Sequence, residues 1–395
     1  MTVHFSPGTS DAASGTGQEE PDSLGVTATG REIRQQPAVW REVAATLVDQ
    51  AAEVRAFLDP LLARPELRIV LAGAGTSAFV GAVLAPSLAR SLGRRVEAVA
   101  TTDVVSNPGE SFAEDLPTLL VSLARSGDSP ESVAATQLAA QCLSSVHHLV
   151  VTCNAQGQLA RDHQGSPSSL VLLMPAASND RGFAMTSSFT SMLLATRLVL
   201  SPGSDDTALT ERLAGAAEHV VAEPHRAVDL ARRGYRRVVY LGSGPLGGLA
   251  RESALKLVEL TAGQVVSYYD TALGFRHGPK AVLDARTLVV VYLSNDPYTR
   301  RYDEDIADEL RRAVGDENVL VVGGRRADSS GRPGGWHVPG LDDVDDAALA
   351  VPLAVVPQLL ALGCSLELGL DPDNPFPDGK VNRVVQGVRV HPLLP

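Results

Sequence analysis

The sequence lacks the cysteines and the positive charge that several protein classes need. Only three of its 395 residues are cysteines, and they form neither a CxxC pair nor a zinc-ligand spacing. We therefore expect three reduced thiols and no metal site. The net charge of −12 at pH 7 argues against nucleic-acid binding, because phosphate backbones are held by basic surfaces. A small anionic ligand stays compatible with this charge, since a local site can be positive on an acidic protein.

Targeting and membrane-spanning signals are also missing. No N-terminal stretch has the charged and then apolar layout of a signal peptide, and we expect no run that spans a bilayer and no membrane partner. The sequence therefore predicts a cytoplasmic protein. What is present is 44% hydrophobic and 20% charged residues, the composition of a globular protein with a packed core. The length suits two domains.

Apolar runs rich in Val and Leu alternate with helical patterns along most of the chain. Continuous runs of this kind indicate strands of a parallel sheet that helices cover on both faces. We expect strands within 68–75, 117–127, 147–154, 168–175, 237–244, 287–295 and 317–324. The fold class is therefore α/β.

The second half of the chain repeats the first. The stretch "RVVYLGSG" (237–244) resembles "RIVLAGAG" (68–75) at an offset of 169 residues (237 − 68). The stretch "TLVVVYLSN" (287–295) resembles "TLLVSLARS" (118–126) at the same offset, and "ENVLVVGG" resembles "VHHLVVTC" at 171 (317 − 146). Three matches at a nearly constant offset predict an internal duplication.

The domain boundaries follow from composition and periodicity. Thr29 and Glu32 form a capping-box pattern that is typical of a helix start. We expect a disordered tail over 1–28, a helical segment over 29–65, a first domain over 66–204, a linking helix over 205–233, a second domain over 234–370 and a C-terminal tail over 371–395.

Both predicted strand-to-helix turns that begin the repeats contain glycine and small residues, "GAGTS" (73–77) and "GSGPL" (242–246). Such turns let backbone N–H groups approach an anion at a helix N-terminus, but a lone GxG is equally compatible with an empty tight turn. The loop "ARSGDSPES" (124–132) is more specific, because its serines precede a proline suited to the first turn of a helix. The loop favours binding of a phosphate on a small substrate over a simple helix cap. No Walker GK[ST] motif follows it, which argues against a nucleotide.

Three ionisable residues lie on one face of the next predicted helix. Glu252, Lys256 and Glu259 are spaced i, i+4 and i+7 in "ARESALKLVELTAG". An exposed ladder of ion pairs is the simpler interpretation. Because the helix starts at the "GSGPL" turn, its polar face can point into the predicted site. A carboxylate on that face is then a candidate general base, which Lys256 would hold charged or orient.

His277 stands in the rigid context "LGFRHGPK". A lone histidine is more often structural. Here Gly278 and Pro279 fix the chain, and Arg276 disfavours an apolar setting, so the histidine suits proton movement on a sugar ring oxygen.

These features together resemble the sugar isomerase (SIS) superfamily. The resemblance is carried by "GAGTSA", by "SLARSGDSPES" and by "ARESALKLVEL" with "GFRHGPKAVLD". It extends to "FAMTSSFT" and "DNPFP…VNRVVQGV", which are similar to the tagatose-6-phosphate ketose/aldose isomerases and the galactosamine-6-phosphate deaminases among them. It implies two tandem SIS domains, each a flavodoxin-like three-layer unit with a parallel sheet.

The resemblance also implies roles for particular residues. As in the isomerase domain of glucosamine-6-phosphate synthase, Glu259 would move a proton between C1 and C2, with Lys256 and Glu252 beside it. His277 would open the sugar ring, reaching across from a partner subunit of a homodimer or higher oligomer. The residues expected to bind the phosphosugar are Gly75, Thr76, Ser77, Arg125, Ser126, Gly127, Ser129, Thr186, Ser187 and Gln386.

The sequence departs from that relative in three ways. Gln386 stands where the relative has a lysine in its site, so the C-terminal tail is expected to pack at the active site. Arg125 replaces a glutamine. No glutamine-hydrolysing domain with an N-terminal cysteine is present, so glutamine-dependent amination is not expected.

The chemistry that fits best is isomerisation with deamination of a 2-amino-2-deoxyhexose 6-phosphate, galactosamine type first. No metal or organic cofactor is required, since a carboxylate and a histidine suffice for proton transfer. Two alternatives stay open. An N-acetylhexosamine 6-phosphate dehydratase would start from the same base at C2 and expel the C3 oxygen, and a non-catalytic phosphosugar sensor would use the same binding loops.

Overall fold

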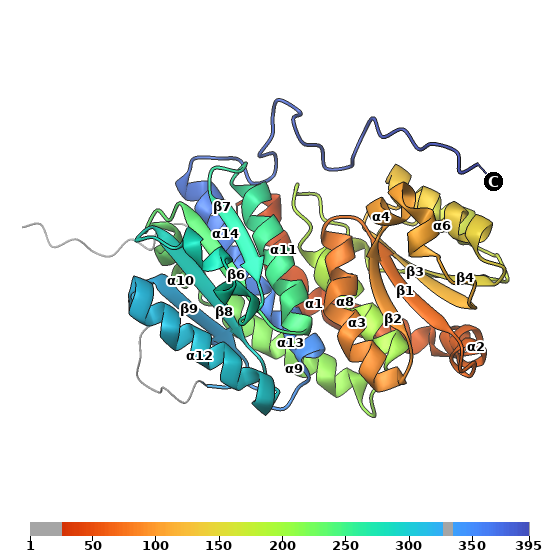
Figure 1. The fold of residues 1–395 in the computed structure, drawn as a ribbon, viewed down its shortest axis with the longest axis horizontal. Helices are drawn as coiled ribbons and strands as arrows, with labels where there is room; N and C mark the ends of the chain where they lie inside the picture. Colours follow the sequence, from red (N-terminus) through yellow and green to blue (C-terminus); the bar gives the residue numbers. More distant parts are fainter. Residues whose placement is uncertain (1–25, 327–334, 395) are drawn as a thin grey trace, which may run out of the picture.

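The computed structural model describes residues 26–326 and 335–394. It contains two five-stranded parallel sheets, one in each half of the chain (Figure 1). The first has the order β2-β1-β3-β4-β5, from Val96–Ala100, Arg68–Gly73, Thr118–Ala124, Val146–Thr152 and Ser169–Leu173. The second has the order β10-β9-β8-β6-β7, from Gly335–His337, Val319–Gly323, Thr287–Leu293, Arg237–Leu241 and Val266–Asp270.

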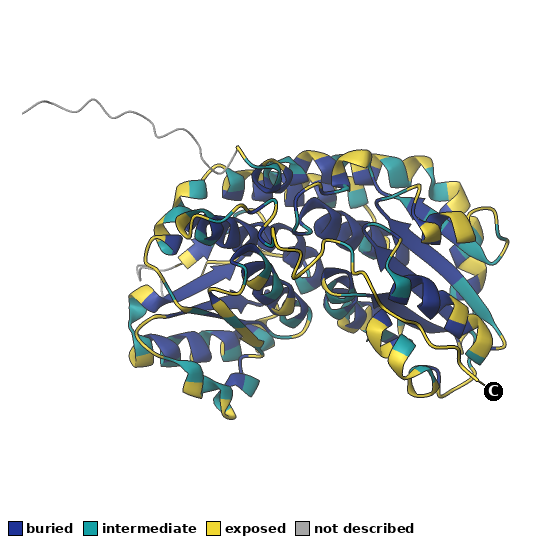
Figure 2. Cartoon of the chain, turned by 90° about the horizontal axis from the view of Figure 1, so that it is seen from above, coloured by how far each residue is buried: buried dark blue, intermediate teal, exposed yellow. Residues whose placement is uncertain are grey.

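The two sheets have the same connectivity and confirm the predicted α/β fold. In each, the first strand of the domain pairs with the second and third, as β1 does with β2 and β3 and β6 does with β7 and β8. The central strands are buried on both faces (Figure 2), which explains their unbroken apolar sequences.

Helices cover both faces of each sheet. The longer helices of the first half are α1 (Ala28–Asp49), α2 (Ala51–Leu62), α3 (Thr76–Leu92), α6 (Pro130–Cys142) and α8 (Ser187–Leu200). The second half has α11 (Pro245–Leu260), α12 (Pro297–Val314), α13 (Asp346–Leu353) and α14 (Val355–Glu367). Short helices α4 (Thr101–Ser106), α5 (Pro108–Ser111) and α7 (Gln158–His163) complete the first half.

The two halves meet where α3 packs against α11. Gly248 is at the closest approach, because a Cβ there would lie 2.5 Å from the backbone nitrogen of Val83 and 2.7 Å from the carbonyl carbon of Ala82. The glycine therefore lets the two helix backbones come close together.

The predicted strands are confirmed, and three further strands were not predicted. The missed strands β2, β7 and β10 are edge strands, and β7 is largely exposed. Their sequences lack the buried apolar run, because an edge strand is covered on fewer sides.

Two expectations about helices are corrected. The segment 205–233 forms two helices, α9 (Asp206–Val221) and α10 (Pro224–Ala231), because Pro224 begins a new helix. The N-cap of α1 is Thr27, whose hydroxyl accepts the backbone N–H of Gly30. Thr29 instead binds the C-terminal tail, as described below. The predicted disordered tail lies almost wholly outside the described residues.

One stretch differs from the expectation about membrane-length runs. Residues 346–367 are long and apolar enough to cross a membrane, but their most apolar 18-residue window is wholly buried in the fold, and the segment is divided into α13 and α14. Their apolar character is that of core helices.

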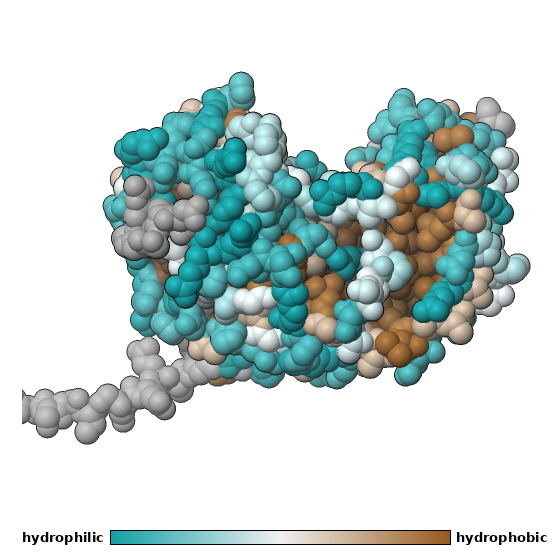
Figure 3. Space-filling view, turned by 90° about the horizontal axis from the view of Figure 1, so that it is seen from below, coloured by the Kyte–Doolittle hydropathy of each residue, from teal (hydrophilic) through white to brown (hydrophobic). Residues whose placement is uncertain are grey.

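Most of the C-terminal tail is exposed. It follows α14, leaves the second domain and runs across the top of the molecule to the first (Figures 1 and 2). On the opposite side, apolar side chains gather in a hollow (Figure 3). A cavity of about 590 Å³ is lined by α1, α2, the end of α8 and the start of α9. Most of the residues that line this cavity are apolar.

Candidate active site

A polar cavity of about 200 Å³ lies at the carboxyl ends of β1 and β3. This is the position where open parallel sheets bind ligands. It is walled by four separate segments of the chain: the turn after β1, the loop after β3, the loop before α8, and the C-terminal tail. One residue of α11, Glu259, completes it.

The turn after β1 brings backbone against the cavity. Gly75 has φ 54° and ψ −127°, a conformation that favours glycine. Thr76 and Ser77 follow as the first residues of α3, and both line the cavity. The N–H of Ser77 donates to the carbonyl of Ala74 at 3.1 Å. The predicted residues of this turn are therefore brought to one place, at a helix end suited to an anion.

The serine loop is held firmly from outside the cavity. Asn154 donates its side-chain N–H to the carbonyl of Ser126 at 2.8 Å, and Gly127 has φ 71°. Ser129 begins α6 as its N-cap but makes no side-chain capping bond. Ser126, Ser129 and Ser132 all line the cavity, so their hydroxyls are available to a ligand.

Arg125 is a buried cation that braces two walls. Its guanidinium donates to the carbonyl of Phe183, at 3.2 Å, and to that of Arg383, at 2.9 Å. Burial and the charge of Arg383 lower the pKa of Arg125. Arg125 therefore links the serine loop to the loop before α8 and to the tail, in a setting where positive charges repel.

The three ionisable residues of α11 are not an exposed ladder. Lys256 is 1% exposed and donates a hydrogen bond to Glu259, while its nitrogen lies 3.7 Å from an oxygen of Glu252. Glu259 is partly exposed and faces the cavity. The first domain's cavity thus receives its carboxylate from the second domain.

The pKa values of the two buried members of this row, Glu252 and Lys256, are both raised. Burial raises the pKa of Glu252 to about 8, outweighing the opposing effect of Lys256, so Glu252 is largely protonated at neutral pH. Burial opposes the charged form of Lys256, but the two carboxylates prevail and raise its pKa. Lys256 therefore stays charged and pairs with Glu259.

Four predicted residues lie apart from this cavity. Thr186 and Ser187 are fully buried, and both donate their backbone N–H groups to the carboxylate of Asp180. His277 and Gln386 are exposed, and neither lines the cavity. Within this chain, the structure does not bring these four side chains to Glu259.

Some wall residues were not predicted. Phe183, Met185, Asn382 and Arg383 line the cavity. They lie inside the motifs "GFAMTSS" and "VNRVVQG". In those motifs, only the hydroxyl residues and the glutamine were predicted to bind the substrate. A sequence gives no indication of which side of an irregular segment faces a cavity.

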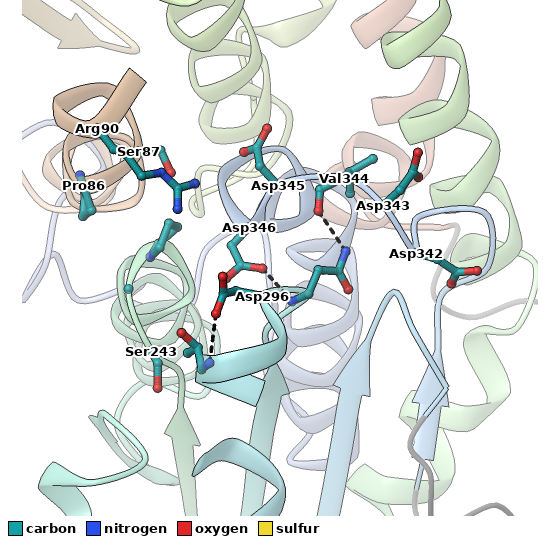
Figure 4. Close-up of a pocket in the computed structure, with 14 residues that line it drawn as sticks. Pro86, Ser87, Arg90, Ser243, Asp296, Asp342, Asp343, Val344, Asp345 and Asp346 are labelled. Carbon is teal, nitrogen blue, oxygen red and sulfur yellow. Dashed lines mark hydrogen bonds between the residues drawn. The ribbon is translucent and has the colours of Figure 1, made fainter. Parts of the chain in front are cut away.

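The second domain has a corresponding pocket of about 400 Å³ (Figure 4). It lies at the turn after β6 and receives Pro86, Ser87 and Arg90 from α3. Five aspartates line it: Asp296, Asp342, Asp343, Asp345 and Asp346. In the parts of the chain that the structure describes, no three His, Cys, Asp or Glu side chains are arranged to hold a metal ion. The pocket is acidic, so it does not suit a phosphate.

Comparisons with known proteins agree with this architecture. Residues 61–202 match the SIS domain family. An AgaS protein of Streptomyces coelicolor is 60% identical over 92% of this chain and 95% of its own length. The D-galactosamine-6-phosphate deaminase AgaS of Shewanella sp. is 44% identical over 95% of both chains.

A solved structure has the same fold throughout. The tagatose-6-phosphate ketose/aldose isomerase of Escherichia coli superposes with a TM-score of 0.86 at 39% identity, over 95% of this chain and 99% of that one. With this coverage and identity across both domains, the chain belongs to the AgaS family of SIS-domain phosphosugar enzymes.

Proposed function

We propose that the protein converts galactosamine 6-phosphate and water into tagatose 6-phosphate and ammonia. The observation that carries this proposal is the carboxylate of Glu259, held by the buried Lys256 at a cavity whose other walls are a serine loop and a helix N-terminus. That combination provides a base and an anion site within one small volume. These are the two requirements for moving a proton on a phosphorylated sugar.

Binding would place the phosphate at the serine loop. Ser126 and Ser129 offer hydroxyls, and the N-terminus of α6 favours negative charge. The sugar would then lie along the turn of Thr76 and Ser77, within reach of Glu259.

Proton transfer would follow in two steps. Glu259 removes the proton from C2 of the open-chain aldose, and the resulting enolamine is protonated at C1. The product is an imine at C2, which water hydrolyses to the ketone with release of ammonia. Lys256 fixes Glu259 through its hydrogen bond, and burial raises the pKa of Glu252 to about 8, so Glu252 adds little negative charge beside it.

Ring opening calls for a second subunit. His277 is exposed on this chain and does not line its own cavity. We propose a cytoplasmic homodimer, or a higher oligomer, in which His277 of one copy acts at the cavity of the other. An active monomer in gel filtration with light scattering would contradict this arrangement.

The activities for which two relatives are named depend on one kind of chemistry. Deamination of galactosamine 6-phosphate and isomerisation of tagatose 6-phosphate both depend on a proton moving between C1 and C2. The nitrogen at C2 decides whether ammonia is released. Glu259 serves either reaction in the same role.

The test is incubation with four sugars: galactosamine 6-phosphate, glucosamine 6-phosphate and their N-acetyl forms. Ammonia and product mass are followed together, with Glu259→Gln as the control. We expect ammonia from the free galactosamine ester and none with the variant. Loss of a water mass from an N-acetyl sugar would instead indicate a dehydratase, and binding without turnover would indicate a sensor.

A further inference from the structure

The C-terminal tail is anchored close to the cavity. The carboxylate of Asp373 accepts hydrogen bonds from the backbone N–H groups of Ala28, at 2.7 Å, and Thr29, at 2.8 Å, and from the Thr29 hydroxyl, at 2.7 Å. Phe376 then packs on Phe183, with ring centroids 5.2 Å apart. The tail is therefore fixed at the start of α1 before it crosses the cavity.

The second attachment is at the cavity itself. Arg125 donates to the carbonyl of Arg383, so the backbone of the tail is held while the side chain of Arg383 is left uncommitted. Within residues 26–326 and 335–394, that side chain has no hydrogen bond or ion pair. Arg383 nevertheless lines the cavity.

The charge of the cavity is unbalanced. Arg125 and Arg383 bring two positive charges to it, and Glu259, already paired with Lys256, is its one lining carboxylate. Both terminal nitrogens of Arg125, Nη1 and Nη2, already donate hydrogen bonds to carbonyl oxygens. A dianion beside the serine loop would offset the repulsion between the two guanidinium groups.

We propose that Arg383 binds the substrate phosphate from the tail, so that the phosphate is held between the tail and the serine loop. The inference rests on the proposed function only for the identity of the sugar. It predicts that the tail selects phosphorylated sugars over free ones.

The test uses the full chain with Arg383→Ala and Arg383→Lys. Arg389→Ala is the matched control, because Arg389 is exposed on the same tail but does not line the cavity. Inorganic phosphate is titrated by calorimetry, and melting temperatures verify folding. We expect Arg383→Ala to weaken phosphate binding about tenfold or more, with partial recovery in Arg383→Lys and no change in Arg389→Ala. An unchanged affinity in Arg383→Ala, or an equal loss in Arg389→Ala, would overturn the proposal.

Turnover gives a second, independent readout. With galactosamine 6-phosphate, Arg383→Ala should raise KM with little change in kcat; a fall in kcat at unchanged KM would contradict a binding role. The phosphate titration needs no turnover. Loss of phosphate binding in Arg383→Ala, in a protein that deaminates no amino sugar, would refute the proposed function and support this inference.

Discussion

The glycine turn after the first strand has the same backbone conformation in both halves of the chain, but different side chains surround it. Gly75 has φ 54° and ψ −127°, and Gly244 has φ 55° and ψ −128°. At the offset of 169 residues, Ser126 corresponds to Asn295 and Gly127 to Asp296. The first turn therefore faces serines and arginines, whereas the second faces five aspartates (Figure 4).

Each half also contributes a helix residue to the pocket of the other half. Glu259 of α11 lines the first domain's cavity, and its counterpart at the same offset, Arg90 of α3, lines the second domain's pocket. The duplicated backbone thus provides two equivalent positions, and the side chains alone decide which becomes a site for an acid–base reaction.

The sharpest test of this comparison removes the ionisable group at each equivalent position. We expect Glu259→Gln to lower kcat about 10²–10⁴-fold, because the amide cannot accept the C2 proton. Arg90→Gln should leave ammonia release unchanged in the same assay. Comparable losses in both variants would mean that the second pocket takes part in the reaction.

The next test concerns the two loops. Ser126→Ala should raise KM for the phosphosugar about tenfold, because it removes a hydrogen bond to a charged group. Asn295→Ala should leave KM unchanged, although it removes bonds to the carbonyls of Leu341 and Val344 and so lowers the melting temperature. Calorimetry should give a stoichiometry of one phosphate bound per chain. A stoichiometry of two would contradict the expectation that the acidic pocket of the second domain excludes anions.

The contact between the halves can be weakened directly. Gly248→Ala should destabilise the protein by about 1–3 kcal/mol, because the new Cβ meets the backbone of Val83. Gly215→Ala is the control, because a Cβ there would meet open space within α9. It should raise the free energy of unfolding by up to about 1 kcal/mol, since alanine favours a helix over glycine. Denaturant midpoints measure both; equal midpoints would show that α3 and α11 can move apart at no cost.

The last test concerns the buried glutamate. The pKa of Glu252 is higher in the folded state, about 8 against an ordinary 4.5, so the folded protein binds the extra proton. Its contribution is fully present below pH 4.5 and is lost as pH rises toward 8. The melting temperature of Glu252→Gln should therefore fall less between pH 5 and 8 than that of the unmodified protein. Parallel curves would mean that Glu252 is ionised in the folded state.

Sequence reasoning predicted the central strands, the duplication and seven of the seventeen residues that line the first-domain cavity. Buried strands such as β3 show in the sequence because both faces demand apolar residues. The edge strand β7 does not, because it is largely exposed. Arg383 was missed for a different reason, since its place depends on where Arg125 holds the tail, and no local pattern encodes that contact.

Because α11 of the second half supplies Glu259 to the first domain's cavity, the second half is needed there whatever its own pocket binds. A gene that shed its second half would also shed Glu259 and Lys256, and with them the proton transfer we propose. Selection on that single step would retain the whole repeat while its pocket was free to drift toward aspartates. In lineages of this family, the turn after β6 should therefore vary more freely than the helix that follows it.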